Sequence, residues 1–120
     1  MLPYLGEHFG NPSSNHRYGR IMREAVERAR EQVASLIDCS APEIYFTAGG
    51  TEANNLAVRG LAAANPGRRQ VITSVIEHPA TVEPCNVLKQ EGYRVDTLPV
   101  DGTTGLEPDD LARIAGTDTL

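Results

Sequence analysis

Hydrophobic residues recur at helical spacing in the first third of the chain. Between Tyr18 and Ile37 they return every three or four positions, and Arg and Glu fill the opposite face. This pattern predicts an amphipathic helix whose apolar stripe packs into a core. The segment before it, residues 1–16, is rich in Gly, Pro, Asn, Ser and His, and we expect it to be an irregular lead-in.

After this helix, short runs typical of strands alternate with helical patterns. β-branched and aromatic residues predict strands at 43–47, 70–75 and 93–100, and the start of a fourth at 118–120. Helices are predicted at 52–64, from near Pro84 to 91, and at 108–115, with a turn at 101–105. Strands that alternate with helices predict an α/β fold, with a mostly parallel sheet flanked by helices.

The length of 120 residues suits one domain, and the sequence contains no repeat, linker or low-complexity segment. We therefore expect one partial domain over residues 1–120, with the α/β portion at 17–120. A sheet of three strands and part of a fourth would leave an open edge and an uncovered face. The chain is therefore expected to be a piece of a larger fold.

The charge pattern disfavours two classes of partner. The net charge is −5, and the basic residues are dispersed, so nucleic acids and anionic membranes are not expected to bind. The first residues do not resemble a signal peptide and no apolar run reaches the length of a membrane span, which makes the cytoplasm the expected location.

The cysteines and histidines do not have the spacing of a metal site. Cys39 and Cys85 are the only cysteines, and we expect reduced thiols there, although the sequence leaves a disulfide between them open. His8 and His16 flank a loop without a third ligand at a suitable spacing, so no metal is expected.

The junction at Gly49, Gly50 and Thr51 is the strongest local indication of chemistry. It joins a predicted strand to a predicted helix, where the first helical amides lack intrahelical partners. Glycines let a ligand approach the backbone closely, the helix dipole favours an anion, and Thr51 adds a hydroxyl donor. A phosphate is the expected occupant. The alternative is an ordinary turn in which Thr51 caps the helix and no ligand binds.

His78 is the second candidate. It follows the predicted strand 70–75, at the end of the sheet where open α/β folds bind ligands. An imidazole there could stack on a flat cofactor ring or exchange protons near neutral pH. The alternative is a structural histidine in a turn. If the strands are parallel, Gly50, Thr51 and His78 lie at the same edge of the sheet.

Several segments together resemble the cysteine desulfurases of the NifS/IscS type. They are GNPSSNH at 10–16, VERAR at 26–30, EIYFTAGGTEANN at 43–55, ITSVIEHPA at 72–80 and LPVD at 98–101. The resemblance implies a class V aminotransferase fold of fold-type I, in which this chain forms part of the large domain that binds pyridoxal 5'-phosphate. It also implies a homodimer that converts L-cysteine to L-alanine and an enzyme-bound persulfide. The sulfur would go to an iron–sulfur scaffold protein or another acceptor, for cluster assembly or for thiolation of tRNA or cofactors.

Carried over to this sequence, the resemblance implies that Gly50 and Thr51 bind the cofactor phosphate. It makes His78 the catalytic histidine that stacks on the cofactor ring. The match is incomplete, because neither cysteine nor Lys89, the one lysine, matches the family's persulfide cysteine or cofactor lysine. These residues, and the aspartate that pairs with the ring nitrogen, are expected beyond Leu120, so the isolated chain should be inactive. The alternatives are another class V enzyme, such as a cysteine lyase or a selenocysteine-acting relative, and a non-catalytic phosphate-binding α/β module.

Overall fold

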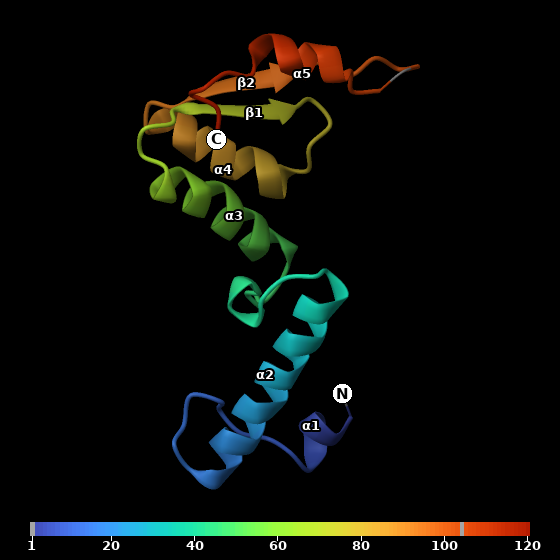
Figure 1. The fold of residues 1–120 in the computed structure, drawn as a ribbon, viewed down its shortest axis with the longest axis vertical. Helices are drawn as coiled ribbons and strands as arrows, with labels where there is room; N and C mark the ends of the chain where they lie inside the picture. The colour runs from blue at the N-terminus through green and yellow to red at the C-terminus, as the bar shows by residue number, and fades with distance from the viewer. Residues whose placement is uncertain (1, 104) are drawn as a thin grey trace. The chain divides into compact units, whose positions relative to one another are not determined.

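The computed structural model describes residues 2–103 and 105–120. The elements in chain order are α1 (Pro3–Gly6), α2 (Arg17–Leu36), a 3-10 turn η1 (Ala41–Glu43), α3 (Gly50–Ala64), β1 (Gln70–Ser74), α4 (Pro79–Gln90), β2 (Arg94–Leu98) and α5 (Pro108–Ile114) (Figure 1). They form two compact units, one ending at Phe46 and the other beginning at Thr47, which we describe separately.

The first unit is built on α2, which begins and ends within one residue of the predicted helix. His16 caps it, because its Nδ1 accepts a hydrogen bond from the Gly19 backbone N–H at 3.3 Å. The guanidinium of Arg23 donates to the Pro12 carbonyl at 2.9 Å, which ties the preceding loop to the helix. The expected irregular lead-in 1–16 is wrong at Pro3–Gly6, which forms the short helix α1 with Pro3 in its first turn.

The strand predicted at 43–47 is wrong. Glu43 ends the 3-10 turn η1, where its carboxylate accepts from the Ser40 N–H at 2.8 Å. Ile44 has extended backbone angles, but no strand pairs with 44–47 within the described residues. Arg30 holds this segment instead, since its guanidinium donates to the Ile44 carbonyl and lies 5.2 Å from the Phe46 ring centre. Extended residues form a strand only when a neighbour completes the hydrogen-bond ladder.

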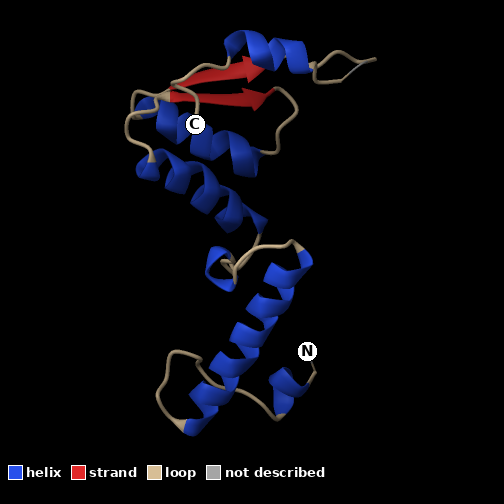
Figure 2. Ribbon diagram, viewed as in Figure 1, coloured by secondary structure: helices blue, strands red, loops and turns tan. Residues whose placement is uncertain are grey.

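The second unit contains a parallel sheet. β1 and β2 pair in register from Gln70 opposite Arg94 to Ser74 opposite Leu98 (Figure 2). On the other side of β1, Gln70 forms a parallel bridge with Thr119, which agrees with the strand start predicted at 118–120. These features confirm the predicted α/β class. At the predicted turn 101–105, Asp101 pairs with Gly105 in an antiparallel bridge, and Thr104 lies outside the described residues.

Helices α3 and α4 pack together, and α4 contacts both strands. The buried core between them contains Ala62, Leu88 and Tyr93, with the partly buried Val58, Val71 and Leu120 against it. The prediction that α4 begins near Pro84 is wrong, because the helix begins five residues earlier at Pro79. Pro79 suits the first helical turn, and Pro84 is tolerated inside the helix as a fully buried side chain.

Gln70 ties three segments of the second unit together. It is 1% exposed, and its Nε2 donates to Asp96 Oδ2 at 2.6 Å and to the Ile114 carbonyl at 2.9 Å. Its Oε1 accepts from the Thr119 hydroxyl. A buried amide is therefore satisfied by β2, the end of α5 and the bridge segment at once.

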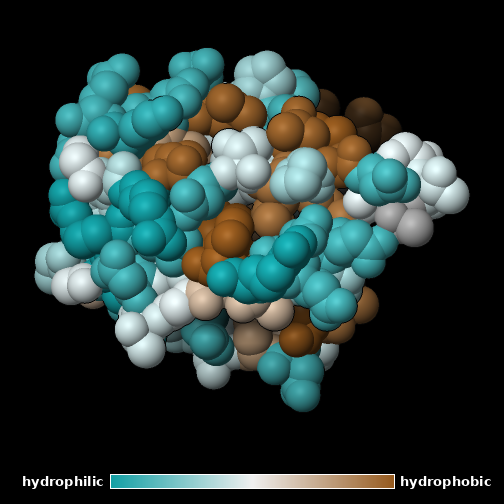
Figure 3. Space-filling view, turned by 90° about the horizontal axis from the view of Figure 1, so that it is seen from above, coloured by the Kyte–Doolittle hydropathy of each residue, from teal (hydrophilic) through white to brown (hydrophobic). Residues whose placement is uncertain are grey.

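The surface keeps many large hydrophobic side chains exposed, among them Val75, Ile76, Leu106 and Leu111 in the second unit. Figure 3 shows hydrophobic groups among hydrophilic ones on one face. None of the helices in the described residues combines the length and the apolar character needed to cross a membrane.

Candidate functional site

The backbone at the start of α3 offers free donors. The helix begins at Gly50, and its first bond across the boundary runs from the Ala53 N–H to the Gly49 carbonyl at 3.1 Å. The N–H groups of Gly50 and Thr51 and the hydroxyl of Thr51 have no acceptor within the described residues, and both residues are exposed. Free amides at the positive end of a helix dipole form a binding site for a compact anion.

Neighbouring side chains hold this turn without occupying those amides. The Glu52 carboxylate accepts from the Ala48 N–H at 2.7 Å, and the Thr47 hydroxyl donates to the Gly49 carbonyl at 3.1 Å. The alternative in which Thr51 itself caps the helix is not realised, because Gly49 is the N-cap and the Thr51 hydroxyl makes no cap bond. The turn is thus fixed while Gly50 and Thr51 stay open to solvent.

The two glycines matter for access to the turn. Gly49 has φ 172° and ψ 174°, an extended conformation that any residue adopts, and Gly50 is helical. A Cβ built on either residue meets no atom within 4 Å, so the described residues themselves do not require glycine at these positions. The turn is therefore open on the side of both glycines.

His78 lies beyond the C-terminal end of β1, as predicted, and it is the N-cap of α4. Its Nδ1 accepts from the Ala80 backbone N–H at 3.1 Å. An Nδ1 that accepts carries no proton, so in the neutral ring the proton sits on Nε2. His78 thus caps α4 through Nδ1, and its exposed ring leaves Nε2 without a partner among the described residues.

A hydrogen bond connects the starts of the two helices. The side-chain amide of Asn54, in the second turn of α3, donates to the Thr81 hydroxyl, in the first turn of α4, at 3.0 Å. Gly50 and Thr51 precede Asn54 by one helical turn, and His78 precedes Thr81 by three residues. The second unit thus brings the predicted turn and the predicted histidine to the same end of the helix pair. The contact between Asn54 and Thr81 could not be predicted from the sequence, because polar residues on helices carry no signal of pairing.

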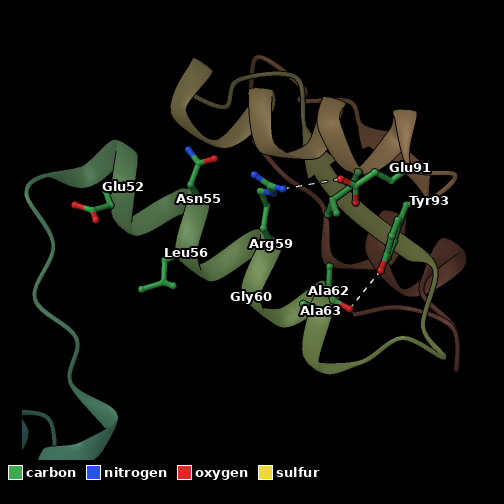
Figure 4. A pocket seen from close by; sticks show the side chains of 10 residues that line it. Glu52, Asn55, Leu56, Arg59, Gly60, Ala62, Ala63, Glu91 and Tyr93 are labelled. Atoms are coloured by element: carbon green, nitrogen blue, oxygen red, sulfur yellow. Dashed lines mark hydrogen bonds and ion pairs between the residues drawn. The ribbon is translucent and has the colours of Figure 1, made fainter.

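A groove runs along α3 from Glu52 and Asn55, next to the helix start, to Ala62 and Ala63 (Figure 4). Two interactions border it: Arg59 pairs with Glu91 at 3.9 Å, and the Tyr93 hydroxyl donates to the Ala62 carbonyl at 3.3 Å. Gly50, Thr51 and His78 do not line the groove. We assign the groove no part in anion binding, because Gly50 and Thr51, which carry the free backbone N–H groups, do not line it.

Cys85 and Lys89 lie beyond the first turn of α4, and Cys39 belongs to the first unit. Cys85 is 2% exposed, and burial, followed by the charge of Glu77, raises the pKa of its thiol. Cys39 is half-buried in the first unit, and both cysteines are free. Lys89 is near the end of α4, about 15 Å along the helix axis from Pro79 at a rise of about 1.5 Å per residue. No group of three potential metal ligands gathers in the part of the chain that the structure describes.

Comparison with known proteins identifies the family. The profile of the family described as aminotransferase class-V matches residues 1–119. The chain is 46% identical to the cysteine desulfurase IscS of Dictyoglomus turgidum over 121 residues, which cover 100% of this chain and 31% of that protein.

Solved structures of related proteins support the same family. A NifS-like protein matches with a TM-score of 0.89 and 33% identity, over 100% of this chain and 33% of its own. SspA, solved in complex with cysteine, matches with a TM-score of 0.85 and 30% identity, over 98% of this chain and 34% of its own. The chain thus spans about a third of the length of these relatives. This chain belongs to the aminotransferase class-V family, and it is similar to the cysteine desulfurases within it.

Proposed function

We propose that this chain is the phosphate-binding portion of a cysteine desulfurase that uses pyridoxal 5'-phosphate. The observation that carries the proposal is the pair of free amides at Gly50 and Thr51, at the start of a helix that is bonded to the start of α4, which His78 caps. The similarity to desulfurases over the whole chain supports the reaction. In that reaction the C–S bond of L-cysteine breaks, the sulfur leaves on an enzyme thiol as a persulfide, and the carbon skeleton leaves as L-alanine.

Each residue has a physical role in this proposal. The N–H groups of Gly50 and Thr51 and the Thr51 hydroxyl bind the cofactor phosphate. The imidazole of His78 packs on the pyridine ring, and its Nε2 holds a proton that it can pass to or from the substrate. The cofactor, when bound, supplies the electron sink that amino-acid chemistry of this kind requires. We assign no catalytic role to Lys89, Cys39 or Cys85.

The remaining parts of the proposal concern the whole protein. It would be a cytoplasmic homodimer that passes sulfur to an iron–sulfur scaffold protein or to another acceptor, for cluster assembly or for thiolation of tRNA or cofactors. No direct contact with nucleic acid or membrane is proposed, since the net charge is −5 and the basic residues are dispersed.

A second candidate is another class V enzyme, such as a cysteine lyase, which would share the phosphate turn. The similarity to SspA, which was solved with cysteine bound, favours cysteine as the substrate in either case. A non-catalytic module that binds some other phosphorylated ligand is the third candidate. Products distinguish the three: a desulfurase forms alanine and a persulfide, a lyase releases other products, and a binding module forms none.

The test uses the full-length protein that contains this chain. Pyridoxal 5'-phosphate is added to the apoprotein, and visible absorbance, alanine and sulfide release with a reductant are measured. The proposal predicts a bound cofactor and alanine formed in proportion to sulfur released. It also predicts that Thr51→Val weakens cofactor binding about tenfold or more, the cost of losing a hydrogen bond to a charged group. Absence of cofactor binding, or products other than alanine, would exclude the desulfurase.

A further inference from the structure

We infer that Asn54 and Thr81 are positioning residues: their hydrogen bond sets the distance between the phosphate turn at Gly50–Thr51 and the ring of His78. The inference rests on the proposed function. Neither side chain is assigned a contact with substrate or cofactor.

The bond joins α3 and α4 near their starts, close in sequence to the residues proposed to bind the cofactor. Asn54 Nδ2 and Thr81 Oγ1 lie 3.0 Å apart, and both residues are half-buried. Within the described residues, no other side-chain hydrogen bond links α3 to α4. The ion pair of Arg59 with Glu91, at 3.9 Å and exposed on both sides, lies at the far end of α4. Among the described residues, the relative position of the starts of α3 and α4 thus depends on one side-chain hydrogen bond.

Near each end of that contact, a backbone hydrogen bond runs back to the N-cap residue of the helix. On α3, the Ala53 N–H, adjacent to Asn54, donates to the Gly49 carbonyl at 3.1 Å. On α4, the Thr81 N–H donates to the His78 carbonyl at 2.8 Å, while the Ala80 N–H donates to His78 Nδ1 at 3.1 Å. Backbone hydrogen bonds therefore fix the start of each helix, and the side-chain bond between Asn54 and Thr81 joins the two starts.

Apolar packing alone would leave the helix starts free to shift. The buried cluster of Ala62, Leu88 and Tyr93 belongs to the C-terminal halves of α3 and α4 and to the connection between α4 and β2. Apolar burial is non-directional, whereas a hydrogen bond weakens steeply with distance and angle. A phosphate and the ring attached to it form one rigid ligand, so the two places that hold it must keep a fixed separation.

The test compares matched variants in the full-length protein. Thr81→Val removes the hydroxyl and keeps the shape, and Thr81→Ser restores the hydroxyl. Asn54→Ala removes the donor, and Asn65→Ala is the control, since the Asn65 side chain bonds only to Leu61 within α3. Two quantities are measured: the dissociation constant of pyridoxal 5'-phosphate from the apoprotein, and the circular dichroism of the bound cofactor, which reports ring orientation.

We expect Thr81→Val and Asn54→Ala each to weaken cofactor binding about three- to tenfold, because a positioning effect cannot exceed the value of the bond itself. Thr81→Ser should restore both the affinity and the dichroism, and Asn65→Ala should change neither. The double variant should bind no more weakly than either single variant, since both remove the same bond.

Three results would overturn the inference. The first is equal affinity and dichroism in Thr81→Val and Thr81→Ser, and the second is additive losses in the double variant. Failure of the proposed function is distinguishable, because the unsubstituted protein would then bind no cofactor. A loss of melting temperature shared by Asn54→Ala and Asn65→Ala, without the dichroism change, would indicate a purely structural role and also contradict the inference.

Discussion

Gly19 lies directly against Ser14: a Cβ built on Gly19 would stand 2.2 Å from the Ser14 carbonyl oxygen and 2.7 Å from that of Asn11. The loop therefore closes onto α2 only because this helical position has no side chain. The Asn11 carbonyl also accepts from the Ser14 N–H at 3.0 Å, so the loop is a compact turn with little freedom to retreat.

Gly19→Ala should therefore destabilise the protein, by about 1–3 kcal/mol as for other overpacked sites. The matched control is Gly60→Ala, in α3, where a Cβ meets nothing within 4 Å and alanine should stabilise the helix by about 0.5–1 kcal/mol. Urea denaturation of both variants, followed by helical circular dichroism, measures the difference. A Gly19→Ala variant as stable as the unsubstituted protein would show that the loop does not pack on α2.

The two thiols should react at different rates. Burial raises the pKa of Cys85, so little thiolate forms near neutral pH, and the side chain is also inaccessible. Alkylation with iodoacetamide, followed by mass spectrometry, should label the half-buried Cys39 first and Cys85 only after denaturant is added. Rapid labelling of Cys85 in the native protein would contradict its burial and reopen the question of its role.

Asp96 should contribute a pH-dependent part of the stability. The hydrogen bond from Gln70, assisted by Arg94, lowers the pKa of Asp96 below its ordinary value of 3.8, although partial desolvation opposes the shift. A lowered folded-state pKa stabilises the fold above the ordinary value, and this contribution is lost as the pH falls through the lower folded-state value.

Melting temperatures measured from about pH 7 down to about pH 3 should therefore fall more steeply for the unsubstituted protein than for Asp96→Asn. Asparagine keeps an oxygen that accepts from Gln70, and it does not titrate. Parallel curves for the two proteins would mean that this carboxylate is not bonded more strongly in the folded state.

The sequence predicted most elements of the second unit because their signals are local. The strand-favouring run at 70–75 and the helical periodicity at 52–64 place β1 and α3 within one or two residues. The segment 43–47 has the same local signal but forms no strand, because a strand also needs a neighbour, and Arg30 holds this segment instead. The start of α4 was misplaced because both Pro79 and Pro84 suit a first turn.

The candidate site was predictable only in its separate parts. Motif and spacing indicate Gly50, Thr51 and His78. β1 and β2 are parallel, but the strand expected at 43–47 does not form, so a shared sheet edge does not align these residues. The hydrogen bond between Asn54 and Thr81 depends on how α3 and α4 meet in space. Side-chain pairs of this kind follow from packing, which residue patterns do not encode.

The Gly49→Ala variant should weaken ligand binding while leaving the stability of the fold almost unchanged. Gly49 is extended and open, so a methyl group there should change the melting temperature by no more than roughly 2–4 °C, as at an ordinary surface position. The same methyl group should hinder a phosphoryl group at the turn and weaken binding of pyridoxal 5'-phosphate. A titration that finds unchanged affinity would place the phosphate away from this turn.

The most direct measurement is a crystal structure of the full-length protein with pyridoxal 5'-phosphate bound. The account predicts phosphate oxygens within hydrogen-bond distance of the Gly50 and Thr51 N–H groups, with the His78 ring stacked on the pyridine. A phosphate bound elsewhere, or an imidazole remote from the cofactor ring, would contradict it.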